Sequence, residues 1–201
     1  MKGVELADSV CWDPHKMMGL PLICSAFLVK QPEVLAKVCA HGNVAHYLFH
    51  ENSRDYDLGR YSLQCGRRND ALKLWLAWRE CGDAGWASLV ENYISLADHL
   101  QTRIDNHPQL EMMSSREWTN VCFRYVPRKD MDFNEMNSEL RLRIMQNADF
   151  MVSRSNIGED VVIRSVISNP GITVSTLDAF IDEVLRIGND IEQGLPRETP
   201  Y

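Results

Sequence analysis

WDPHKMMG, residues 12–19, decides how the first part of this chain is interpreted. It follows a short strand-like run, ADSVCW (7–12), and precedes PLICSAFLVK (21–30), which is long and apolar enough for a fully buried strand. Asp-Pro ends the first strand and begins a turn. Lys16 therefore stands between two strands of buried type, where an ammonium group is costly unless it is paired or neutralised. Burial would lower the pKa of Lys16 and make its amine a nucleophile toward carbonyls; the alternative is a lysine that caps a strand end beside a polar His15.

The bulk composition is ordinary for a globular protein and argues against several kinds of partner. Of the 201 residues, 45% are hydrophobic and 24% are charged, and the net charge is −7. The chain has no basic tract of the kind that binds nucleic acid, and no apolar run of the length that spans a membrane. Six cysteines are spread singly without a CxxC pair, so we expect reduced thiols, a cytoplasmic protein and no metal site.

The chain divides into two parts of different character. Helical spacing predicts helices over 31–42, 67–82 and 83–108, with Gly82 between the last two and a long polar stretch over 43–60. The remainder predicts a small α+β sandwich with an antiparallel sheet. Its expected elements are strands 110–114 and 119–127, helix 134–148, strands 149–155 and 159–168, and helix 173–193.

The first part is too small to bury its own strands. Strands of buried type need sheet neighbours and covering helices that these eighty or so residues do not contain, so we expect the tail end of a larger α/β domain. Apolar side chains at Leu22, Ile23, Phe27 and Leu28 would then be exposed. The predicted organisation is a remnant of a large domain over 1–85, a connecting helix over 86–108 and a small domain over 109–201.

Residue by residue, DSVCWDPHKMMGLPLICSAFLVK (8–30) resembles the lysine segment of the group II pyridoxal-phosphate-dependent amino-acid decarboxylases. Within that family it is most similar to the glutamate decarboxylase and cysteine sulfinate decarboxylase branch, where Asn-Pro-His-Lys-Met-Met-Gly is typical. In this chain Asp13 replaces the Asn of that motif. Four later segments resemble the branch in the same order. They are its mobile loop (YLFHENSRDYD, 47–57), its following helix (LQCGRRNDALKLWLAWRECG, 63–82), and two strands of its small domain (TNVCFRYVP, 119–127; IRSVISNPG, 163–171).

The resemblance implies a fold and an assembly. The fold is α/β plus α+β, the C-terminal portion of a fold-type I enzyme dependent on pyridoxal 5′-phosphate: the end of the large cofactor domain, then the small C-terminal domain. The complete enzyme is expected to be a homodimer. Met1 would then be an internal methionine of a longer reading frame.

The resemblance also implies roles for particular residues. Lys16 would hold the cofactor as a Schiff base, and His15 would contact the cofactor phosphate. Tyr47 would close over the site and protonate the substrate carbon after CO2 leaves; its alternative role is an aromatic anchor for the loop. Arg164 would pair with the substrate α-carboxylate, and its alternative is a half-buried ion pair inside the small domain. The CGRR arginines, Arg67 and Arg68, are interpreted as structural.

Two hypotheses about function follow. In the first, the chain belongs to a lyase that decarboxylates a small acidic amino acid, with glutamate, aspartate and cysteine sulfinate all open. In the second, the 201-residue chain is an inactive fragment or an interaction module of such an enzyme.

Overall fold

The computed structural model describes residues 2–39, 58–64 and 66–197 and divides the chain into two compact units, Met1–Asp83 and Ala84–Tyr201. Within these described ranges, no helix combines the length and the apolarity needed to cross a membrane.

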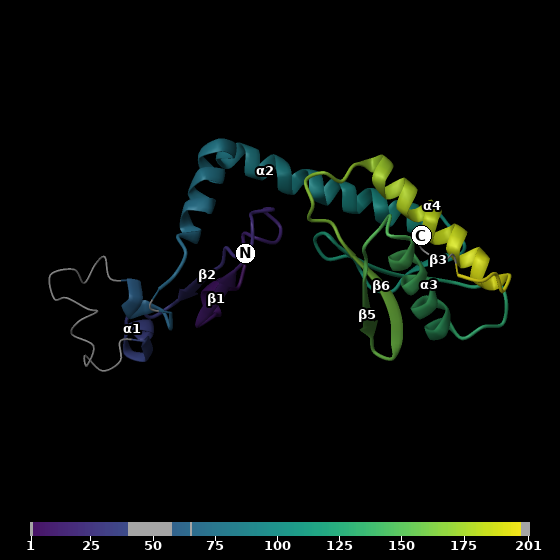
Figure 1. Cartoon of the computed structure of the whole chain (residues 1–201), viewed down its shortest axis with the longest axis horizontal. Helices are drawn as coiled ribbons and strands as arrows, with labels where there is room; N and C mark the ends of the chain where they lie inside the picture. The colour runs from purple at the N-terminus through teal and green to yellow at the C-terminus, as the bar shows by residue number, and fades with distance from the viewer. Residues whose placement is uncertain (1, 40–57, 65, 198–201) are drawn as a thin grey trace. The chain divides into compact units, whose positions relative to one another are not determined.

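An antiparallel hairpin forms the centre of the first unit (Figure 1, purple). A single 3-10 turn, η1 (Val4–Leu6), leads into β1 (Ser9–Trp12), which pairs with β2 (Ala26–Val29). The hairpin is followed by α1 (Glu33–Cys39), which contacts the 3-10 turn η4 (Leu58–Tyr61). The predicted strand over 7–12 and the beginning of the predicted helix over 31–42 are therefore confirmed.

The predicted strand over 21–30 is shorter than expected, and a lysine distant in sequence explains why. Lys73 Nζ donates to the carbonyls of Pro21, Leu22 and Ile23 at 3.4, 3.2 and 3.0 Å. The same ammonium is paired with Asp70 at 2.8 Å, in the first turn of α2 (Asp70–Asp105). These carbonyls point at a helix side chain instead of a neighbouring strand, so the sheet begins only at Ala26.

The strand β2 is not buried as the apolar run predicted, because no layer of the described residues covers it. Leu22 is 70% exposed and Ile23 63%, and Phe27 and Leu28 are each more than half exposed. This confirms that the first unit leaves these four apolar side chains uncovered.

The predicted helices over 67–82 and 83–108 are one kinked element, α2. Gly82 has φ 63° and ψ 178°, a conformation that interrupts the helix and that a residue with a Cβ rarely adopts. The segment before the kink belongs to the first unit and the segment after it to the second. The prediction that Gly82 separates two helices is confirmed in this sense.

The second unit is built on a four-stranded antiparallel sheet in the order β3-β4-β6-β5. Its strands are β3 (Leu110–Met112), β4 (Asn120–Tyr125), β5 (Ser153–Ile157) and β6 (Asp160–Val166). The helices α3 (Phe133–Asn147) and α4 (Val174–Glu192) pack on this sheet (Figure 1, green and yellow). The α+β sandwich expected from the sequence is confirmed.

One strand of the sheet begins later than its sequence predicted. Ala148 ends α3 in a left-handed conformation, φ 63°, and β5 starts only at Ser153 instead of at residue 149. The backbone between them runs as a connection, where Arg141 Nε donates to the Val152 carbonyl at 3.2 Å. The apolar residues Phe150 and Met151 in this connection therefore gave a false strand signal.

The buried face of the sheet has two tight contacts with the helices. Gly188 in α4 lies directly against the ring of Tyr125, and a Cβ placed there would meet that ring. Asn137 in α3, which has no exposed surface, accepts from the Tyr125 amide at 2.7 Å and donates to the Tyr125 carbonyl at 3.0 Å. A side-chain amide thus supplies the hydrogen bonds that a neighbouring strand residue would otherwise make.

Candidate active site

The residues from Asp13 to Leu20 form a compact turn after β1. The backbone amide of Lys16 donates to the Asp13 carbonyl at 2.9 Å, and that of Gly19 donates to the Lys16 carbonyl at 3.0 Å. Leu20 N closes the turn on the Pro14 carbonyl at 3.3 Å, and both of these side chains are buried. Gly19 has φ 67°, the left-handed conformation that favours glycine. The turn is anchored on its apolar residues and directs Lys16 outward.

Lys16 is exposed and charged, so of the two alternatives that its position between strands left open, the buried lysine with a lowered pKa is wrong. Its side chain is 70% exposed, and Nζ lies 2.7 Å from Asp13 Oδ2. The hydrogen bond and the charge of Asp13 raise the pKa of Lys16 above its usual value. The same contact, together with a 2.5 Å hydrogen bond from Ser25 Oγ, lowers the pKa of Asp13 to about 2. Both groups are therefore ionised at neutral pH.

His15 is fixed by the backbone of the next strand-forming segment. Its Nδ1 lies 2.7 Å from the carbonyl oxygen of Cys24, and Ser25 Oγ lies 3.4 Å from the same nitrogen. The Cys24 amide nitrogen also lies 3.3 Å from Nδ1. Because the carbonyl contact is the shorter one and a carbonyl can only accept, Nδ1 is assigned as the donor, and Nε2 of the neutral ring is then an acceptor. Cys24 is itself buried, and its Sγ lies 3.6 Å from the Asp70 carbonyl at the start of α2.

Arg164 lies in β6 of the second unit, on the edge of a small cavity. The cavity has a volume of about 200 Å³, and its lining includes the polar residues Ser165 and Thr176 and the apolar residues Leu177 and Phe180. Among the residues that the structure describes, none forms a hydrogen bond or an ion pair with the Arg164 guanidinium. The half-buried ion pair considered as its alternative role is therefore not formed within the described ranges.

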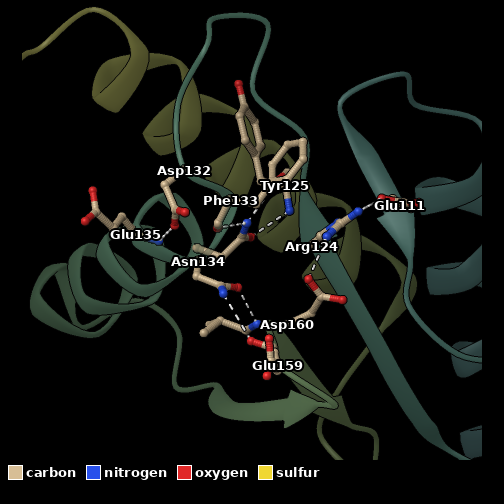
Figure 2. Close-up of polar contacts among 11 residues, drawn as sticks. Glu111, Arg124, Tyr125, Asp132, Phe133, Asn134, Glu135, Glu159 and Asp160 are labelled. Atoms are coloured by element: carbon tan, nitrogen blue, oxygen red, sulfur yellow. Dashed lines mark hydrogen bonds and ion pairs between the residues drawn. The ribbon is translucent and has the colours of Figure 1, made fainter.

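The neighbouring arginine of the sheet shows what such an ion pair looks like here. Arg124 in β4 donates to Glu111 at 2.8 Å and to Asp160 at 3.3 Å, and its side chain is only 16% exposed. Its guanidinium also lies over the ring of Phe133, 4.6 Å from the centroid (Figure 2). Arg124 is thus fully engaged by its own unit, whereas the Arg164 guanidinium has no such partner among the described residues.

The remaining predicted residues are placed as follows. Lys16 and His15 lie side by side in the first unit, and Arg164 belongs to the second. Tyr47 lies outside the described residues. Arg67 and Arg68 are exposed.

The sequence interpretation noted only that Asp13 replaces the typical Asn, and it missed the contact of Asp13 with Lys16. Ser25, which orients the Asp13 carboxylate, was missed as well. The signal for the Asp13 contact was available: an acidic and a basic residue three positions apart, across a turn set by Pro14.

Comparisons with known proteins agree with the resemblance in the sequence. Residues 1–126 match the family model described as the pyridoxal-dependent decarboxylase conserved domain. The crystal structure of mouse CSAD is 30% identical, with a TM-score of 0.79 over 93% of this chain and 41% of that one. Oryza sativa TDC, crystallised with PLP and tryptamine, is 23% identical, with a TM-score of 0.85 over 95% of this chain and 40% of that one. Catharanthus roseus tryptophan decarboxylase is 21% identical, with a TM-score of 0.81 over 94% of this chain and 38% of that one. The chain therefore spans 41% or less of the length of these three structures.

Proposed function

Because this chain belongs to the pyridoxal-dependent decarboxylase family, we propose that it carries the cofactor lysine and the small domain of a carboxy-lyase acting on a small acidic amino acid. Its fold is that of the C-terminal portion of these enzymes, the end of the large domain followed by the small domain. The observation that carries the proposal is the family match over residues 1–126, which contains the Lys16 turn.

The residues of the turn fit an aldehyde cofactor that bears a phosphate. Lys16 supplies a primary amine that is open to solvent, as a covalent anchor requires. His15 is held through Nδ1, and its Nε2 would donate to a phosphate oxygen in the imidazolium form, in which both ring nitrogens carry a proton. When bound, pyridoxal 5′-phosphate supplies an electron sink for the pair of electrons that remains when the carboxylate leaves as CO2.

Arg164 is proposed to bind the substrate carboxylate. A guanidinium fork suits the planar, bidentate geometry of a carboxylate, and this one has no competing acid among the described residues. Its position inside β6, between the partners Cys122 and Ser153 on the adjoining strands, fixes its backbone. Tyr47 is proposed as the phenol that returns a proton to the substrate carbon.

The substrate class is supported by the similarity to mouse CSAD and by the branch that the Lys16 segment resembles. Glutamate, aspartate and cysteine sulfinate are the candidates. The matches to tryptophan-acting enzymes share 23% identity or less with this chain and inform only its fold.

The test uses the full chain, with Lys16→Arg as the control because arginine keeps the charge but forms no stable imine. One sample is incubated with pyridoxal 5′-phosphate, reduced with borohydride and mapped by peptide mass spectrometry. In a separate sample that is not reduced, CO2 release is measured with each acidic amino acid and with tryptophan. We expect a reduced adduct on Lys16 that the control lacks, and CO2 release from an acidic amino acid. Adducts scattered equally over other lysines would refute the assignment of Lys16, and release from tryptophan alone would refute the substrate class.

A second function is favoured by the exposed apolar side chains of the first unit. An uncovered apolar surface is formed by Leu22, Ile23, Phe27 and Leu28. Exposed apolar surfaces of this kind often bind another protein or cause aggregation. On this alternative the chain is inactive by itself, as a fragment or as an interaction module. Light scattering and binding of a hydrophobic dye separate the two, because an enzyme that assembles as a homodimer should have a defined mass and little dye binding.

A further inference from the structure

Asp13 has a contact with the proposed anchor lysine that the chemistry of cofactor binding does not require. Its Oδ2 lies 2.7 Å from Lys16 Nζ, and its Oδ1 accepts from Ser25 Oγ at 2.5 Å. Each carboxylate oxygen therefore has a separate partner. The backbone contact from Lys16 N to the Asp13 carbonyl holds the two residues on the same side of the turn.

From this arrangement we propose that Asp13 is a positioning residue that holds free Lys16 as an ion pair and thereby sets the fraction of Lys16 able to bond an aldehyde. The inference rests on the proposed function, in which Lys16 is the cofactor anchor. The family branch that the segment resembles typically has asparagine here, and a neutral amide cannot pair with an ammonium in this way.

The balance of the bonding step shows why the pair matters. The Lys16 ammonium must first release a proton to solvent. The neutral amine then attacks the aldehyde carbon, a C=N bond replaces the C=O bond, and one water leaves. Asp13 stabilises only the ammonium form of Lys16. It therefore opposes the loss of the proton that must precede imine formation, and it stabilises the free lysine whenever the imine is broken.

Few other titratable groups of the described chain act on this pair. Cys11 in β1 donates a weak hydrogen bond from its Sγ to Asp13 Oδ1 at 3.7 Å. The adjacent His15 acts weakly on Asp13. Asp13 is the largest influence on Lys16 among these, and its contact geometry is the shortest.

The experiment measures the reactivity of Lys16 directly, without requiring catalysis. Wild-type chain, Asp13→Asn and the control Asp8→Asn are labelled with formaldehyde and cyanoborohydride at a series of pH values, and methylation of the Lys16 peptide is quantified by mass spectrometry. Asp8 is exposed and lies before β1, so its variant makes the same change of charge nearby. We expect Asp13→Asn to raise Lys16 methylation at neutral pH by about two- to fivefold, the range of one exposed ion pair, and Asp8→Asn to leave it unchanged.

Ser25→Ala provides a second variant, since it keeps the charge but frees the carboxylate to rotate. It should give a smaller rise than Asp13→Asn. An unchanged pH profile of Lys16 in both variants would overturn the inference.

A parallel arm with pyridoxal 5′-phosphate and borohydride separates the inference from the proposed function. If methylation of Lys16 rises in Asp13→Asn while no pyridoxyl adduct forms on Lys16 in either protein, the inference holds and the proposed anchor role is wrong. If the adduct forms on Lys16 with the same pH profile in both proteins, the anchor role holds and the inference is wrong.

Discussion

Replacing Lys73 by methionine should loosen the segment that follows the lysine turn. The substitution keeps the length and the apolar part of the side chain but removes the ammonium that binds three consecutive carbonyls. The affected backbone includes Cys24, whose carbonyl fixes His15. The variant therefore tests whether α2 positions the proposed cofactor site through the loop.

The magnitude follows from the geometry of the ammonium. Lysine has three N–H donors, and Lys73 has four acceptors within reach, counting Asp70, so the 3.4 Å contact with Pro21 is the weakest. The two shorter contacts, to Leu22 and Ile23, count fully at about 0.5 to 1.5 kcal/mol each. Because water can replace the ammonium at these exposed residues, we expect a loss of about 1 to 2 kcal/mol of local stability.

Amide hydrogen exchange of peptides covering residues 14–25 measures this loss. A change of 1 to 2 kcal/mol corresponds to exchange that is roughly 5- to 30-fold faster. The control is Lys37→Met, which removes an exposed lysine of α1 and should leave these peptides unchanged. Equal exchange in Lys73→Met and wild type would refute the argument that this ammonium holds the loop.

Three further predictions concern the second unit. In an enzyme that contains this chain, Arg164→Met should lower kcat/KM by about 10- to 100-fold, the worth of a charge-assisted carboxylate contact, with no change in Tm, as kinetics and thermal melting would show. Gly188→Ala should cost about 1 to 3 kcal/mol in urea unfolding, because its Cβ would lie within 2.7 Å of the buried Tyr125 ring. Glu192→Gln should reduce the dependence of the unfolding free energy on pH in the acid range. Burial raises the pKa of Glu192, but hydrogen bonds from Arg128 outweigh this effect and lower the pKa below 4.5. The Glu192 contribution is thus present above the unfolded pKa and is lost as the pH falls through the lower folded pKa, as acid titration at fixed urea would show.

Each of these predictions has a clear contrary result. A lower Tm in Arg164→Met would mean that the guanidinium has a structural partner. For the glycine, Gly171→Ala is the matched control, because its Cβ would have only an ordinary 3.4 Å contact; equal stability of the two variants would contradict the packing argument. An unaltered acid slope in Glu192→Gln would show that another carboxylate dominates.

The antiparallel sheet could be predicted from the sequence because its residues carry a local signal. Asn120 to Val126 alternate in polarity, and the turn and cap residues lie close by in the chain. The helix break at Gly82 could be predicted as well, because a glycine between two helical patterns indicates the end of a helix. Local patterning was sufficient wherever the neighbours in space were also neighbours in sequence.

The candidate site could be predicted only in part, because its details depend on distant residues. The apolar run that begins at Pro21 predicts a strand. Only the fold shows that Lys73, some fifty positions later, donates hydrogen bonds to the first carbonyls of this run. Arg124 and Arg164 look alike in sequence, each within an apolar strand. Their difference comes from Glu111 and Asp160, which pair with Arg124 and were not expected to do so.

The paired hydrogen bonds of Asn137 have a consequence for the ageing of the protein. Asparagine amides hydrolyse slowly to carboxylates, especially at elevated temperature. Conversion at this position would remove the donor to the Tyr125 carbonyl and leave a negative charge in a site with no exposed surface. Burial within α3 protects the amide only while the second unit stays folded. Each transient opening therefore exposes it to a reaction whose product destabilises the folded unit, so the storage lifetime of the protein should follow the frequency of unfolding of this unit.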